Sequence, residues 1–148
     1  MHQIFGPDVQ LTSENEWSKA LYEQDNSLKL LGITITKIER EYIEGEMTIS
    51  EEMCNGFGTA QGGILFTFAD ALFAGACNST TDTPTVASQA NIHFLSPGKL
   101  GRRLRGVARQ RQSWGRNGIT DVTLYDGDTV VAEFRGTSRT TSRQPSGK

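Results

Sequence analysis

The sequence predicts an α+β fold in which a curved antiparallel sheet wraps around one long central helix. The segment from Gly62 to Asn78 is apolar on nearly every side when read with helical periodicity, which is typical of a buried helix. Two segments before it and four after it alternate between apolar and polar residues, as strands do. A helix that needs cover on every side indicates a strongly curved sheet.

We expect one domain, because 148 residues suffice for a core without disulfides and are too few for two comfortable domains. Residues 13–140 form this domain, between a loose N-terminal segment (1–12) and a loose C-terminal tail (141–148). A helix comes first. The capping-box motif Ser13-Glu14-Asn15-Glu16 predicts where this helix begins. Asp25-Asn26-Ser27 is expected to interrupt the helix, and Gly32 to end it.

Strands and turns account for most of the remaining chain. Alternation predicts strands over about 33–36 and 42–49, then a loop from Glu51 to Ala60. After the central helix, one strand is expected to turn five residues to the same face, namely Val86, Ser88, Ala90, Ile92 and Phe94. The last two strands are joined by a hairpin turn at Asp126-Gly127-Asp128. Helix, two strands, buried helix and four strands together predict the hotdog fold.

Composition excludes several classes of protein. The longest apolar stretch, in Ile64–Ala76, contains Asp70 and is too short to span a membrane, and residues 1–20 lack the layout of a secretory signal. Cys54 and Cys77 have no metal-binding spacing and are expected to be core thiols in the cytoplasm, so no metal site is predicted. Nucleic-acid binding is disfavoured by an acidic pI, near 5.7, and by the lack of a predicted helix that could read DNA.

Asp70 is the candidate catalytic carboxylate. Between Glu52 and Asp82 no other side chain ionises as a carboxylate or a base. Burial near Phe66, Phe68, Leu72 and Phe73 would raise its pKa toward the range that a general base or nucleophile needs at neutral pH. The alternative is an Asp that caps a loop or faces water on an exposed stripe of the helix.

The helix start Gln61-Gly62-Gly63 is the second candidate element. Backbone N–H groups of a first helical turn are free, and two glycines allow a ligand to approach closely, which suits a carbonyl oxygen that gains negative charge. Glycines before helices are common, so this signal alone is weak. Asp70 lies eight residues further on, roughly 12 Å along a helix. If the two groups act together, they come from different chains, which predicts a two-fold dimer with composite sites.

The segments Asn55-Gly56-Phe57-Gly58-Thr59-Ala60-Gln61-Gly62-Gly63 and Phe66-Thr67-Phe68-Ala69-Asp70 resemble the signature of hotdog thioesterases of the phenylacetic-acid-degradation (PaaI) family. Phe94-Leu95-Ser96-Pro97-Gly98 and other short matches extend the resemblance from about Ala20 to Thr140. It implies a cytoplasmic thioesterase that acts on an aryl-acetyl or related acyl-CoA. It also implies a homodimer, commonly paired into a tetramer, and no cofactor.

Carried over to this sequence, the resemblance makes Asp70 the general base or nucleophile and Gly62 the oxyanion donor of the partner's site. Asn55 then lies near the attacking water or carboxylate, and Gln61 supports the oxyanion loop. The candidate substrate-binding residues are Gln61, Gly63, Phe57 and Ser88. Ser88 stands where the family sometimes has a polar site residue, and it is as well explained as a small core residue.

Two positions depart from the family pattern. Phe57 and Gln61 stand where the family usually has histidine. Gln61 still donates and accepts hydrogen bonds but does not titrate, and Phe57 is expected to wall an acyl pocket or pack in its loop. The alternative function is therefore a weakly active or non-catalytic acyl-CoA-binding protein. A hotdog hydratase is a further alternative, disfavoured because no histidine lies within twenty residues of Asp70.

Charge is divided unevenly along the chain. Residues 1–98 contain four Lys/Arg and 13 Asp/Glu, whereas residues 99–148 contain 11 and four. Arg103, Arg105, Arg109 and Arg111 line one face of a predicted strand. This stripe is either a solvated surface or, as we favour, a contact for the phosphates of coenzyme A.

Overall fold

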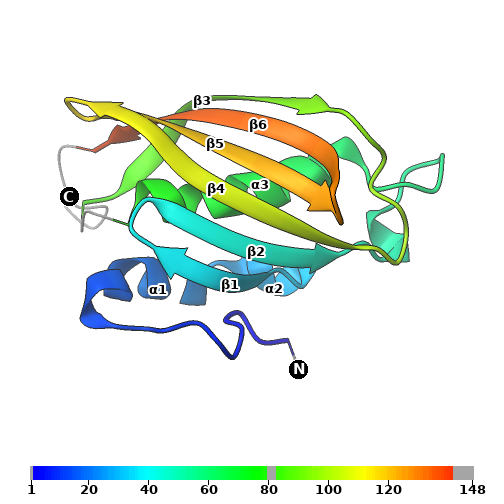
Figure 1. Cartoon of the computed structure of the whole chain (residues 1–148), viewed down its shortest axis with the longest axis horizontal. Helices are drawn as coiled ribbons and strands as arrows, with labels where there is room; N and C mark the ends of the chain where they lie inside the picture. Colours follow the sequence, from blue (N-terminus) through cyan, green and yellow to red (C-terminus); the bar gives the residue numbers. More distant parts are fainter. Residues whose placement is uncertain (1, 80–82, 142–148) are drawn as a thin grey trace.

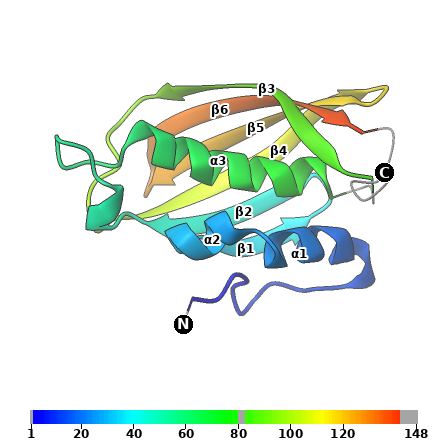
Figure 2. The same ribbon diagram turned by 180° about the vertical axis from the view of Figure 1, so that it is seen from behind.

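Six antiparallel strands form one sheet in the computed structural model, which describes residues 2–79 and 83–141 (Figure 1). The predicted α+β hotdog fold is confirmed. The strands are β1 (Thr34–Glu39), β2 (Tyr42–Thr48), β3 (Thr85–Phe94), β4 (Arg103–Trp114), β5 (Asn117–Asp126) and β6 (Thr129–Thr140), in the spatial order β1-β2-β4-β5-β6-β3. The long helix α3 (Gly62–Cys77) lies across one face of this sheet, as the view from behind shows (Figure 2).

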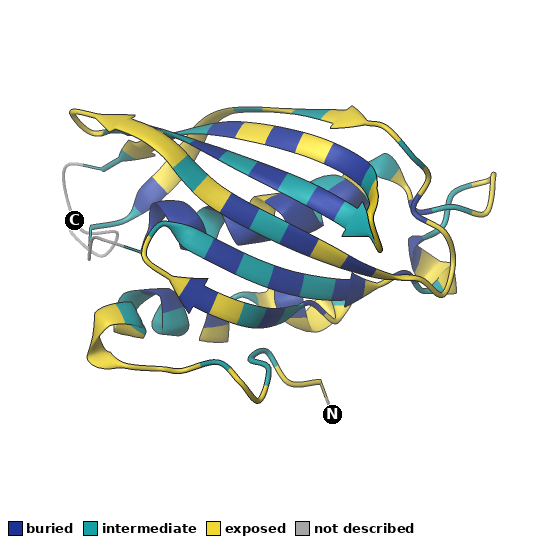
Figure 3. Ribbon diagram, in the orientation of Figure 1, coloured by how far each residue is buried: buried dark blue, intermediate teal, exposed yellow. Residues whose placement is uncertain are grey.

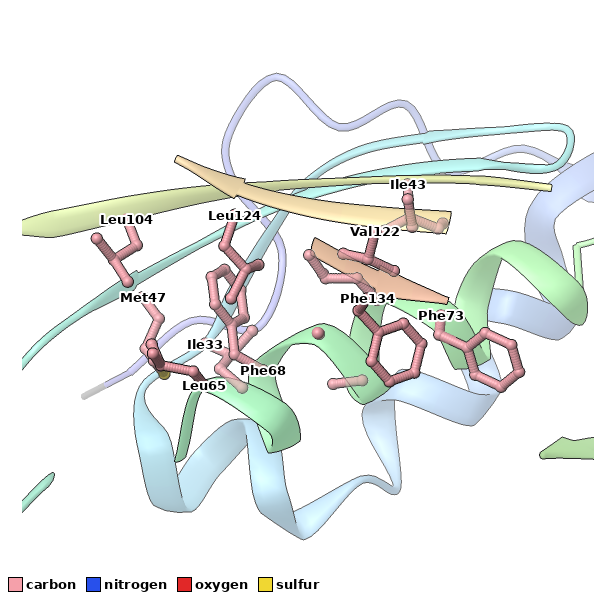
Figure 4. Packing of buried hydrophobic residues seen from close by; sticks show 14 of the residues in the cluster. Ile33, Ile43, Met47, Leu65, Phe68, Phe73, Leu104, Val122, Leu124 and Phe134 are labelled. Carbon is pink, nitrogen blue, oxygen red and sulfur yellow. The ribbon is translucent and has the colours of Figure 1, made fainter. Parts of the chain in front are cut away.

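The core fills the space between α3 and the sheet. Buried residues alternate with more exposed ones along β2, β4 and β5, so each strand turns one face to the helix (Figure 3). Phe68 and Leu72 of α3 belong to the same hydrophobic cluster as Leu104, Val122 and Leu124, and these five side chains are fully buried. Figure 4 shows Phe68 on the helix together with Leu104, Val122 and Leu124 of the sheet. This packing fixes the direction in which the opposite face of α3 points.

The N-terminal helix is divided as the sequence predicted. It comprises a short 3-10 turn (Ser13–Asn15), α1 (Glu16–Glu23) and α2 (Asn26–Leu31). Asp25 caps α2 by accepting a hydrogen bond from the Ser27 N–H at 2.9 Å, and Gly32 ends the helix at a φ of +66°. The capping box is one residue earlier than predicted, because Thr12 and Asn15 bond each other's backbone.

The segment before this helix is not a loose end throughout. The N–H of Gly6 donates to the Ile35 carbonyl at 2.8 Å, and the Ile35 N–H donates to the Ile4 carbonyl at 2.7 Å. These bonds place the N-terminal segment along the outer edge of β1. The expected C-terminal tail lies outside the described residues, except Thr141.

One strand departs from the predicted pattern. A bulge between Ala87 and Gln89 shifts the register of β3 against β6, and Ala90 and Ile92 pair with the inward-facing Gly136 and Phe134. Val86 and Ser88 are exposed and do not share that face with Ala90 and Ile92. An inserted residue reverses the alternation of a strand, so simple period-two counting fails there.

Candidate active site

Asp70 lies near the middle of α3, on the side that faces away from the core. Its neighbours Phe68 and Leu72 are fully buried, whereas Asp70 is exposed in the single chain. The sequence left two possible surroundings for Asp70, burial among aromatic side chains or a position on an exposed stripe of the helix. In a single chain, Asp70 lies on the exposed stripe. The helix period explains this, since residues two positions apart point in nearly opposite directions. Partial desolvation still raises the pKa of Asp70, and the negative charge of Asp25 raises this pKa further.

The turn of α3 that carries Asp70 is held from behind by α1. The hydroxyl of Tyr22, which is fully buried, donates to the carbonyl of Ala71 at 2.9 Å. Burial raises the pKa of this phenol well above its usual value, so it stays a donor. Tyr22 is a positioning residue that the sequence pattern did not indicate. The available signal was Gly75, whose missing side chain leaves room for the Tyr22 ring against α3.

Gly62 and Gly63 form the open start of α3. Gln61 is the N-cap residue, and its carbonyl accepts from the N–H groups of Ile64 and Leu65 at 2.9 and 3.3 Å. Within the described part of the chain, the N–H groups of Gly62 and Gly63 have no acceptor. Both donors lie at the positive end of the helix dipole, so they can bind an oxygen that acquires negative charge.

Asn55 organises the loop that precedes this helix. Its Oδ1 accepts from the N–H groups of Phe57 and Thr59 at 2.9 and 3.3 Å, and Gly58 adopts a φ of +79° at the turn. The oxygen of Asn55 is thus occupied by the loop. Its Nδ2 has no acceptor among the described residues, so it remains as the group that can donate to a ligand.

Three other candidate residues are exposed in the single chain. Phe57 is 94% exposed at the loop tip, so within its own chain it neither lines the cavity described below nor packs in the loop. The side chain of Gln61 is exposed and has no hydrogen-bond partner in the described residues. Ser88 lies at the β3 bulge and donates to the Thr137 carbonyl at 3.1 Å. These residues would meet substrate only where another surface covers them.

A cavity of about 380 Å³ opens beside the start of α3. Asn55 and Gly62 line one side of it, and Phe94 with the segment up to Gly98 lines the other. The N–H of Ala60 donates to the Gly98 carbonyl at 2.8 Å, which ties the two walls together. The sequence analysis had not singled out Phe94 as a site residue. A larger cavity of about 930 Å³ lies between the N-terminal segment and β1, and neither Gly62 nor Asp70 lines it.

Gly62 and Asp70 are held apart by the helix that contains both. Helix α3 is continuous from Gly62 to Cys77, so the two residues are eight positions apart in regular α-helix. At about 1.5 Å per residue this is roughly 12 Å, too far for one thioester group to touch both. Within a single chain, one thioester group therefore cannot contact both the Gly62 N–H and the Asp70 carboxylate.

The arginine stripe of β4 lies on the outer face of the sheet, opposite α3. Leu104 of β4 points into the core, whereas Arg103 and Arg105 point outward. Their partners there are Glu46 at 3.6 Å for Arg103 and Glu44 at 3.7 Å for Arg105. These arginines are cross-strand partners of carboxylates and do not line the cavity beside Gly62.

Comparison with known proteins shows the family to which this chain belongs. Residues 57–133 match the family model of the thioesterase superfamily, and the chain belongs to that superfamily. It is 37% identical over 129 residues to acyl-coenzyme A thioesterase PaaI of Escherichia coli (strain K12), across 85% of this chain and 91% of that one. The solved structure of E. coli PaaI superposes with a TM-score of 0.83 at 34% identity, covering 89% and 99%.

Two further proteins are similar to this chain. Acyl-coenzyme A thioesterase 13 of Homo sapiens is 34% identical over 129 residues, which cover 84% of this chain and 92% of the relative. A Streptococcus mutans protein solved with acetyl CoA superposes with a TM-score of 0.72 at 25% identity, covering 76% and 90%. The resemblance to PaaI-type hotdog thioesterases is thus confirmed over most of the chain, and the protein is a thioester hydrolase. In the described ranges, no helix has the length and hydropathy needed to cross a membrane.

Proposed function

We propose that this protein hydrolyses the thioester bond of an acyl-CoA in a site shared by two chains. Asp70 of one chain acts as general base on water, or as nucleophile, and the N–H of Gly62 of the partner subunit binds the carbonyl oxygen. The observation that carries this proposal is the unbroken helix between Gly62 and Asp70. This helix holds the Gly62 N–H and the Asp70 carboxylate of one chain too far apart to act on the same thioester.

Free surfaces beside Asp70 support such a dimer. In the described part of the chain β3 pairs with β6 alone, so its other edge has unpaired backbone groups, whereas the N-terminal segment covers the edge of β1. An uncovered edge strand is a template for pairing with another chain. The outward side of α3 continues this surface with small residues, namely the partly exposed Thr67 and Ala74 beside Asp70 and the exposed Gly63 at the helix start. A two-fold partner seated on this surface would bring its own Gly62 toward Asp70. Pairing of two such dimers remains a proposal taken from the family resemblance.

The remaining site residues receive supporting roles. We assign Asn55 Nδ2 as a donor to the attacking water or the thioester, and Gln61 as a support of the loop that presents Gly62. Gly63 provides a second free N–H at the helix start. Phe57 and Ser88 are exposed in one chain, and we assign them to substrate contacts that the partner subunit completes.

The names of the relatives support acyl-CoA esters as the class of substrate, and the aryl-acetyl group comes from the family resemblance. E. coli PaaI and human thioesterase 13 are named as acyl-coenzyme A thioesterases, and the S. mutans protein was solved with acetyl CoA. We propose aryl-acetyl-CoA and related acyl-CoA esters as substrates. No cofactor is required, because an activated water or carboxylate and an oxyanion donor suffice for the hydrolysis of a thioester.

A weakly active or non-catalytic acyl-CoA-binding protein is the second candidate. It is favoured by Phe57 and Gln61, which leave no imidazole at this helix start. Release of free thiol from a panel of aryl-acetyl, short and long acyl-CoA esters separates the two candidates. Turnover of one class supports the enzyme, and binding without turnover of any supports the alternative.

Two substitutions test the assigned roles. Asp70→Asn is expected to lower kcat by about 10²- to 10⁴-fold, the usual contribution of a general base. Asp128→Asn, at the exposed tip of the β5–β6 hairpin, is the matched control and should retain activity.

Gly62→Pro removes the N–H at the first helical position, where proline is tolerated. Gly62→Ala adds a similar Cβ and keeps the N–H. Equal activities of these two Gly62 variants would contradict the oxyanion role.

A further inference from the structure

The aromatic ring of Phe94, the last residue of β3, lies directly against Gly62. A Cβ atom on Gly62 would be 3.0 Å from Cζ of this ring and 3.3 and 3.5 Å from Cε2 and Cε1. In the register of the sheet Phe94 pairs with the inward-facing Ala132, so its side chain points to the α3 side. Yet 53% of Phe94 is exposed, so much of the ring is free to contact a bound molecule.

The cavity that Phe94 shares with Gly62 suits hydrocarbon better than amides. Ala60, Leu65, Leu95 and Pro97 contribute apolar surface to it. The backbone N–H groups of Leu95 and Ser96 are already bonded, since both donate to the carbonyl of Val131, at 2.8 and 3.2 Å. Two donors of the cavity that the described residues leave free are the Gly62 N–H and the Asn55 Nδ2, which the proposed function assigns to the thioester carbonyl and the attacking water. A pantetheine arm, which carries two amides, would lose hydrogen bonds to water here and recover few. An aliphatic or aromatic acyl group would lose none.

The chemistry of a thioester limits what the ring can touch. The carbonyl carbon bears the oxygen, the sulfur arm and the acyl group, and all three begin within one bond of it. When the carbonyl oxygen is bound to the Gly62 N–H, the neighbouring ring of Phe94 can contact either the acyl group or the pantetheine arm that begins at the sulfur. The apolar lining favours the acyl arm.

We propose that Phe94 is a specificity-determining residue that contacts the acyl group of the substrate and favours acyl groups with an aromatic ring. The proposal rests on the proposed thioesterase function and extends it to the acyl side of the site. Aromatic rings prefer offset or edge-to-face contacts with each other, which an acetyl group does not provide. The preference for phenylacetyl-CoA over acetyl-CoA should therefore depend on Phe94.

The test compares Phe94→Ala with the natural protein on phenylacetyl-CoA and acetyl-CoA. We expect the ratio of the two kcat/KM values to fall about tenfold, through loss of the aromatic contact and of buried apolar area. Phe94→Leu should restore part of the ratio, because it replaces the area without the ring. Val86→Ala is the matched control, since Val86 is also 53% exposed on β3 and does not line the cavity.

Two results would overturn the proposal. Phe94→Ala could lower kcat/KM equally for both substrates, which would indicate a contact with the pantetheine arm or a purely structural role. Alternatively, Phe94→Ala could leave both kcat/KM values unchanged, which would indicate that the ring does not contact the substrate. Measuring the Kd values of both CoA esters in the Asp70→Asn background gives the same comparison without turnover. A failure of the thioesterase proposal would then appear as absent thiol release, separately from the Kd ratio that tests Phe94.

Discussion

Replacing Gly75 by Ala is expected to destabilise the protein, because α3 and α1 leave no room for another methyl group there. A Cβ atom on Gly75 would lie 1.9 Å from Oη of Tyr22 and 2.5 Å from Cζ of the same ring. Tyr22 is fully buried and its hydroxyl is bound to the Ala71 carbonyl, so the ring cannot swing into solvent. Either the ring or the turn next to Asp70 must move.

The size of the effect follows from three contributions. Overpacking a filled core costs about 1–3 kcal/mol. Losing the hydrogen bond from Tyr22 to Ala71 adds about 0.5–1.5 kcal/mol. The better helix propensity of Ala offsets up to about 1 kcal/mol. The expected net loss in free energy of unfolding is about 0.5–4.5 kcal/mol.

Urea unfolding followed by circular dichroism at fixed protein concentration measures this loss. Gly63→Ala is the matched control on the same helix, because a Cβ atom there has no neighbouring heavy atom within 4 Å. It should be neutral or slightly stabilising. Equal unfolding midpoints for Gly75→Ala and Gly63→Ala would refute the claim that Tyr22 braces α3.

Two further predictions concern charge. Asp25→Asn keeps a helix cap but removes a negative charge that raises the pKa of Asp70, so this pKa should fall. Because the general base must be ionised, the acidic limb of the kcat/KM profile should move to lower pH, and an unmoved limb would argue against Asp70 as the titrating base. Replacing both Arg103 and Arg105 by Ala should leave KM for CoA esters within about twofold and cost under about 1 kcal/mol of stability, as exposed cross-strand ion pairs do. A KM that rises several-fold, most strongly at low salt, would instead restore the coenzyme contact suggested by the charge pattern.

Much of the fold was readable from the sequence because local rules agreed with the tertiary structure. Asp25 and Gly32 bound the second short helix as their capping chemistry predicts. The apolar run from Gly62 onward identified the central helix. The strands beside it follow their alternation wherever no residue is inserted.

The features that escaped prediction depend on contacts between distant segments. Ser88 leaves the expected face because β3 bulges to fit β6, which no local signal indicates. Phe94 joins the site because the end of β3 meets the start of α3, more than thirty residues earlier in the chain. The exposure of Asp70 also follows from three-dimensional packing, since the sheet and α1 cover only part of α3.

The central claim, a site shared by two chains, is tested most directly with hybrid dimers. Asp70→Asn and Gly62→Pro chains, each inactive alone, are refolded together in equal amounts, and thiol release is measured against the natural protein. In a hybrid, one site combines both defects and the other has an intact Asp70 and an intact Gly62. Random pairing makes half the dimers hybrid, so about a quarter of the natural activity should return. No recovery above the two parents would contradict the shared site.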